Sequence, residues 1–79
     1  MELQVIEHTK ERYGFAYSHT AIIRTLVDVT KHHDEVVAQT SIECGYHPAG
    51  YGLYGPSTIK PTENPNEYVV KWHTASSCD

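Results

Sequence analysis

Alternating hydrophobic and polar positions near the start of the chain predict a β-strand. Residues 2–8 are rich in β-prone side chains, and Leu3 and Val5 fall on one face of an extended segment. The residues that follow, 10–14, are polar and end in Gly14, a composition typical of a turn. We therefore expect a strand over residues 2–8 with a turn shortly after it.

The last third of the chain predicts a β-hairpin. Residues 61–66 read Pro-Thr-Glu-Asn-Pro-Asn, a run of turn formers that separates residues 57–61 from residues 67–74. In the second of these segments, hydrophobic and polar positions alternate so that Val70 and Trp72 share the face expected to be buried. Trp72 is the first choice for a core aromatic residue, with Phe15 second.

Residues 15–30 fit two structures. As a strand, they place on one face Ala21, Ile23, Thr25, Val27 and Val29, while Arg24 and Asp28 point away. As a helix, they form a stripe of Ile22, Ile23, Leu26 and Val27, with Ser18 or Thr20 as an N-cap. The density of Ile, Val and Thr favours the strand.

Residues 34–45 are predicted to form a helix. Asp34 is a suitable N-cap, and Glu35 would place a second acidic side chain near the positive end of the helix dipole. Three residues recur at helical spacing to form the inward face: Val37, Ser41 and Cys44. Gly45 fits the position just past the helix end, where glycine is common.

These elements together predict one α+β domain over residues 1–79. We expect a small antiparallel sheet of about four strands with one helix packed on it, in the order β-β-α-β-β. The rival order, β-α-α-β-β, applies if residues 18–30 are helical. A chain of 79 residues is near the lower limit for folding unaided. An exposed edge strand beside a thin core would also suit a homodimer.

The charge balance narrows the class of partner. The net charge is −4, which disfavours direct binding to nucleic acid, where clustered Lys and Arg must replace counterions. It also disfavours binding to anionic membranes and suits a basic protein surface. The first residues lack the pattern of a signal peptide, and no apolar run approaches a membrane span. We expect a cytoplasmic protein whose two cysteines are thiols.

The most distinctive part of the sequence is residues 44–56, which we name the Gly-Tyr segment. It contains four of the five glycines and three of the six tyrosines. Glycine allows close backbone approach, and tyrosine is favoured at recognition surfaces. The segment either covers one face of the domain or contacts a partner, and in the second case the partner-binding residues are Tyr46, His47, Tyr51 and Tyr54.

Three motifs that suggest catalysis or nucleotide binding are weak. Residues 50–55 match G-x-G-x-x-G, yet a proline and a strand follow where a helix is required. The neighbouring His32, His33 and Asp34 point in different directions on any regular element. Cys44 lies at an expected helix C-terminus, where the dipole raises the thiol pKa and disfavours a nucleophile. No catalytic residue and no cofactor are therefore predicted.

Four residues have spacings that suit a tetrahedral zinc site: Cys44, His47, His73 and Cys78. They form C-x2-H and, later in the chain, H-x4-C, and a structural metal would stabilise a thin core. One cysteine in each half is weaker than paired cysteines, and a buried Cys44 acting as a small hydrophobic residue is the favoured interpretation.

We expect a non-enzymatic binding protein that inhibits a protein target by occluding its surface. The profile of a small acidic cytoplasmic domain without a catalytic motif resembles, in type and not in sequence, the accessory proteins with which phages and mobile elements block host machinery. The resemblance implies a basic or nucleic-acid-handling target, such as a host defence complex. The alternatives are a zinc-stabilised module or subunit of a larger assembly and, third, a small Cys-dependent enzyme.

Overall fold

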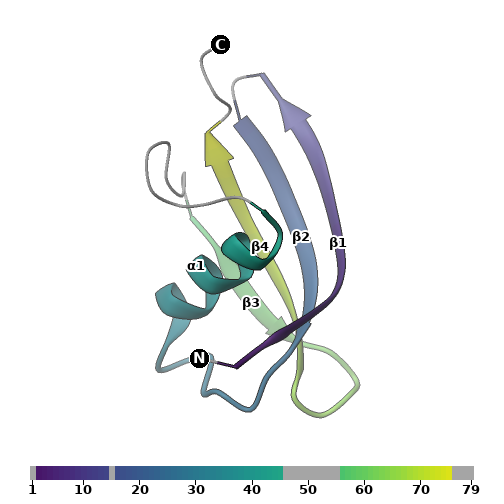
Figure 1. The fold of residues 1–79 in the computed structure, drawn as a ribbon, viewed down its shortest axis with the longest axis vertical. Helices are drawn as coiled ribbons and strands as arrows, with labels where there is room; N and C mark the ends of the chain where they lie inside the picture. Colours follow the sequence, from purple (N-terminus) through teal and green to yellow (C-terminus); the bar gives the residue numbers. More distant parts are fainter. Residues whose placement is uncertain (1, 15, 46–55, 76–79) are drawn as a thin grey trace.

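The computed structural model describes residues 2–14, 16–45 and 56–75, and in them the chain forms one antiparallel sheet with one helix on it (Figure 1). The elements in chain order are β1 (Gln4–Tyr13), β2 (Ala16–Arg24), α1 (His33–Glu43), β3 (Thr58–Pro61) and β4 (Glu67–Ala75). The strands lie in the order β1-β2-β4-β3. The predicted α+β class and the order β-β-α-β-β are confirmed.

The two central strands supply most of the core. In the pairing of β2 with β4, Ala21 lies opposite Val70 and Ile23 lies opposite Tyr68. Residues opposite one another in an antiparallel pair share a face, so these side chains form one apolar surface beneath α1. Val70 and Trp72 are buried, as predicted.

Helix α1 lies across that surface because its buried residues recur at helical spacing. They are Val36, Val37, Thr40 and Ser41. The Thr40 hydroxyl donates to the carbonyl of Val36 at 2.7 Å, so the buried hydroxyl is satisfied within the helix. Gly45 follows the helix with a φ of 91°, the left-handed conformation predicted for it.

The strand interpretation of residues 15–30 is correct for β2 and wrong beyond it. The strand ends at Arg24, and an irregular connection leads to α1. Thr25 is buried, as the strand pattern predicted. Val27 and Val29 also pack against the core, although they lie outside any strand.

Two other sequence predictions were wrong. Residues 10–13 belong to β1 and are not part of a turn, because Lys10 pairs with His19 and Tyr13 with Ala16. The N-cap of α1 is His32, while Asp34 lies in the first helical turn. The Asp28 carboxylate instead shapes the approach to the helix, since it accepts hydrogen bonds from the backbone of Thr30 and Lys31 at 3.0 and 3.1 Å.

Candidate functional site

The tyrosine-rich site predicted from the sequence lies outside the described residues. Tyr46, His47, Tyr51 and Tyr54 all fall in residues 46–55. Their role in partner binding stays a prediction.

The two described members of the predicted zinc set do not converge. Cys44 packs against the core on the helix side of the sheet. His73 follows Trp72 in β4, and because side chains alternate along a strand it lies on the opposite face. His47 and Cys78 fall outside the described residues, and in the rest no group of three or more His, Cys, Asp or Glu could hold a metal ion.

Cys44 also has the character of a core residue and not of an activated nucleophile. Burial, followed by the neighbouring Glu43 carboxylate, raises the pKa of its thiol. The thiolate is the reactive form of cysteine, so this environment suppresses reactivity. The direction agrees with the sequence prediction, but the causes are burial and Glu43 and not the helix terminus.

The solvent side of α1 presents an acidic surface with an apolar centre. We name it the outer helix face and define it by five residues: Glu35, Ala38, Gln39, Ile42 and Glu43. They recur at intervals of three and four, on the side of the helix away from its buried residues. Ile42 is 40% exposed and adds a large apolar side chain to this face.

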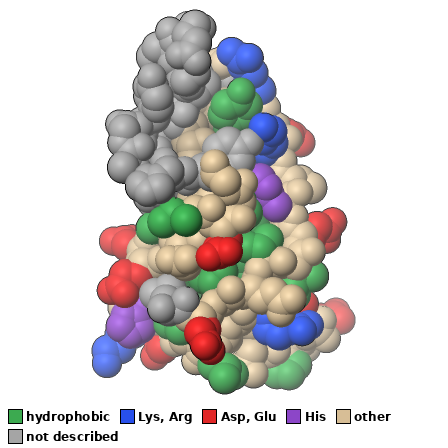
Figure 2. Space-filling view, viewed as in Figure 1, with side chains coloured by type: hydrophobic (Ala, Val, Ile, Leu, Met, Phe, Trp, Pro, Cys, Tyr) green, Lys and Arg blue, Asp and Glu red, His purple; other side chains and the backbone are tan. Residues whose placement is uncertain are grey.

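Each glutamate of this face has one polar neighbour on α1 or at its N-cap. The amide of Gln39 donates to a carboxylate oxygen of Glu43 at 2.9 Å. Nδ1 of His32 lies 3.6 Å from a carboxylate oxygen of Glu35. The helix sequence carries three carboxylates and neither Lys nor Arg. Figure 2 shows acidic side chains dispersed over the side of the molecule on which α1 lies. The face is therefore locally negative around Ile42.

Sequence reasoning missed this face although the signal was present. The spacing of Val37, Ser41 and Cys44 identified the inward side of the helix. The residues half a turn away from them are the acidic side chains and Ile42. The helix positions opposite the buried residues are thus enough to predict the outer helix face.

The sheet also contains a buried histidine cluster. The rings of His8, His19 and Trp72 stack, with centroids 5.2 Å apart for the histidines and 4.8 Å for His19 and Trp72. Nδ1 of His19 lies 3.0 Å from Nε2 of His8, and its Nε2 lies 2.8 Å from the hydroxyl of Thr74. Burial, followed by the charges of His8, Lys10 and His73, lowers the pKa of His19 to about 4. Both ring nitrogens of His19 therefore have partners, whereas the buried indole nitrogen of Trp72 has none in the described part of the chain.

Comparisons with known protein families, curated proteins and solved structures found no match to this chain. In the described residues, no helix is both long enough and apolar enough to cross a membrane.

Proposed function

We propose that this protein is a non-enzymatic binding protein that occludes a basic surface of a protein partner through its outer helix face. The observation that carries the proposal is the exposed Ile42 on a helix face that also carries Glu35 and Glu43. An apolar centre with a charged rim is the arrangement of a typical protein interface. The positive charge of a basic partner complements the acidic rim, and an apolar depression on the surface of that partner would receive Ile42.

Electrostatics would contribute mainly to the rate and selectivity of this association. Clustered carboxylates raise the rate at which a basic surface is encountered, and the effect weakens as salt screens the charges. The overall charge of −4 acts in the same direction. Burial of Ile42 would then slow dissociation, because contacts at the centre of an interface provide most of the binding free energy.

The proposed partner is a basic protein that handles nucleic acid. The small acidic profile of the sequence suggests a host defence complex as the specific candidate. An acidic protein that occupies such a surface excludes the nucleic acid that would otherwise bind there. This mode of action needs no catalytic residue. The Gly-Tyr segment would provide a second contact to the same partner.

The proposal is tested by comparing protein capture from a bacterial lysate by two triple variants. The first variant changes the outer helix face and carries Glu35→Gln, Ile42→Ser and Glu43→Gln. All three side chains are exposed or on the surface of α1, so the fold should tolerate the changes. We expect the variant to lose the basic prey that the wild-type protein retains.

The matched control makes the same chemical changes on β1 and carries Ile6→Ser, Glu7→Gln and Glu11→Gln. Ile6 is 45% exposed, and both glutamates are exposed. The control alters net charge by the same amount and should retain the prey. Equal capture by the two variants, or loss of prey with the control alone, would contradict the proposal.

A further inference from the structure

A groove lies at the end of the sheet where β1 begins and β2 ends. Its volume is about 870 Å³, and three separate parts of the chain line it. These are the residues before and at the start of β1, the end of β2 with the connection that follows, and the turn between β3 and β4. The residues that matter for its chemistry are Glu2, Leu3, Arg24, Leu26, Val27 and Pro65.

The groove is held in shape by Thr25, which joins all three parts. Its backbone N–H donates to the carbonyl of Asn66 at 2.9 Å. Its hydroxyl donates to the carbonyl of Glu2 at 2.8 Å and accepts from the N–H of Val27 at 3.1 Å. Thr25 is 4% exposed, so these bonds are shielded from water. The walls are therefore formed before any ligand binds.

One wall of the groove is apolar and open to solvent. Leu26 is 86% exposed, more than any other large hydrophobic residue in the described part of the chain. Leu3 and Val27 line the groove while packing against the core, and Pro65 lines it from the turn. Covering Leu26 would remove apolar surface from water, which favours a ligand with an aliphatic group.

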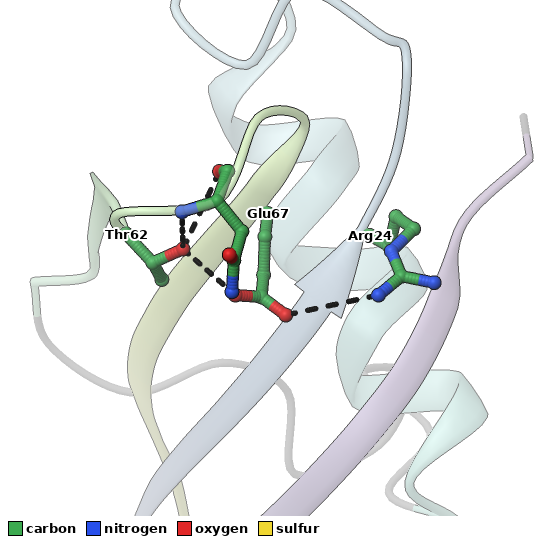
Figure 3. Close-up of polar contacts among 4 residues, drawn as sticks. Arg24, Thr62 and Glu67 are labelled. Carbon is green, nitrogen blue, oxygen red and sulfur yellow. Dashed lines mark hydrogen bonds and ion pairs between the residues drawn. The ribbon is translucent and has the colours of Figure 1, made fainter.

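A second wall carries the guanidinium of Arg24, whose side chain is 59% exposed. Its nearest carboxylate belongs to Glu67, but the two groups approach only to 4.0 Å (Figure 3). The Glu67 carboxylate is held instead by the hydroxyl of Thr62 at 2.8 Å and the amide of Asn64 at 2.6 Å. These two hydrogen bonds are the main causes that lower the pKa of Glu67.

The arrangement leaves Arg24 able to bind a second carboxylate. Glu67 keeps the guanidinium beside the groove without taking a close bidentate contact from it. Arginine has five N–H donors in a planar fork, and a carboxylate is the group that matches two of them at once. The groove thus combines an aliphatic surface with a cationic group suited to a carboxylate.

We infer that this groove binds an extended peptide segment of a partner protein in which an aliphatic side chain stands next to a carboxylate. The aliphatic side chain covers Leu26, and the carboxylate pairs with Arg24. Glu2 lines the same groove and favours a cationic residue on the other side of the aliphatic one. The inference is independent of the outer helix face, which lies on a different element.

The test uses a blocked synthetic peptide, acetyl-Lys-Leu-Glu-Leu-amide, followed by changes in the amide NMR spectrum of the protein. The matched control peptide is acetyl-Lys-Leu-Gln-Leu-amide, which differs only in the carboxylate. At about 1 mM peptide, we expect shifts confined to the groove and binding at least about fivefold tighter for the Glu peptide, roughly 1 kcal/mol.

Two protein variants complete the test. Leu26→Ser and Arg24→Gln should each lower the affinity for the Glu peptide about fivefold to tenfold. Lys60 is an exposed charged residue on β3, and Lys60→Gln should leave this affinity unchanged. The Arg24 variant should also lose the preference for Glu over Gln. Shifts outside the groove, equal binding of the two peptides, or no shift at all would overturn the inference. None of these readouts depends on the outer helix face.

Discussion

The buried histidine cluster predicts that the fold loses stability in mild acid, mainly through His19, with a smaller contribution from His8, whose pKa is also lowered by burial and by the charge of Lys10. His19 is fully buried between the ring of His8, the ring of Trp72 and the hydroxyl of Thr74. Its pKa is lowered from 6.5 to about 4, with burial the largest cause. The folded state therefore favours the neutral ring, whereas the unfolded chain gains a proton near pH 6.5. Stability from this group is fully present above about pH 6.5 and is lost progressively as the pH falls toward 4.

The magnitude follows from the difference between the two pKa values. A shift in the pKa of His19 from 6.5 to about 4 lowers the free energy of unfolding by about 2 kcal/mol between about pH 7.5 and pH 5. We treat this as an upper value, because His8 is only half-buried and water beside it screens part of the charge on His19. The expected loss is about 1–2 kcal/mol, a large share of the stability of so small a domain.

The assay is urea unfolding at about pH 7.5 and pH 5 for the wild-type protein and two variants. His19→Gln removes the titrating ring. Between the two pH values, its free energy of unfolding should fall by about 1 kcal/mol less than that of the wild-type protein. His32→Gln, at the start of α1 and outside the cluster, should keep the wild-type dependence within about 0.5 kcal/mol. Equal pH dependence in His19→Gln and wild type would refute the reasoning. If His19→Gln does not fold, an NMR titration of wild-type His19 decides, and a midpoint near 6.5 would refute it.

Four further substitutions test the structural account by urea unfolding at neutral pH. Thr25→Val should lower the free energy of unfolding by about 2 kcal/mol, because the carbonyl of Glu2 and the N–H of Val27 lose their partner; a change below about 0.5 kcal/mol would show that these bonds do not hold the groove. Val36→Ala should cost about 2 kcal/mol through the cavity it leaves beneath α1, and Ile42→Ala much less, since Ile42 is partly exposed; equal costs would contradict the orientation of the helix. Gly45→Ala should cost about 1 kcal/mol, because a φ of 91° strains a residue with a Cβ, and an unchanged stability would mean that the helix ends differently.

Much of the fold could be predicted because the buried faces follow regular periods. Val70 and Trp72 stand two residues apart in β4, and Val37 and Ser41 stand four apart in α1, so each pattern identifies both the element and its inward side. The second half of β1 could not be found in this way. Lys10, Glu11 and Arg12 show no apolar alternation, and their extended conformation depends on pairing with β2.

The candidate surfaces differ in how far the sequence determines them. The outer helix face follows from the helical period, since Glu35, Ile42 and Glu43 lie opposite the buried stripe. The groove brings Leu3, Arg24 and Pro65 together from distant parts of the chain, and only the arrangement of strands and turn shows it. The histidine cluster likewise depends on the register between strands, which places His8 beside His19.

Contact between the outer helix face and a basic partner is tested by site-specific photocrosslinking from that face. The photoreactive residue p-benzoylphenylalanine replaces Ile42 in one protein and Ile6 on β1 in the other, two positions of similar exposure. On irradiation in a bacterial lysate, the account predicts that one basic protein is crosslinked from position 42 and not from position 6, and that the yield falls as salt is raised. Crosslinking of the same proteins from both positions, or of no protein from position 42, would contradict the account.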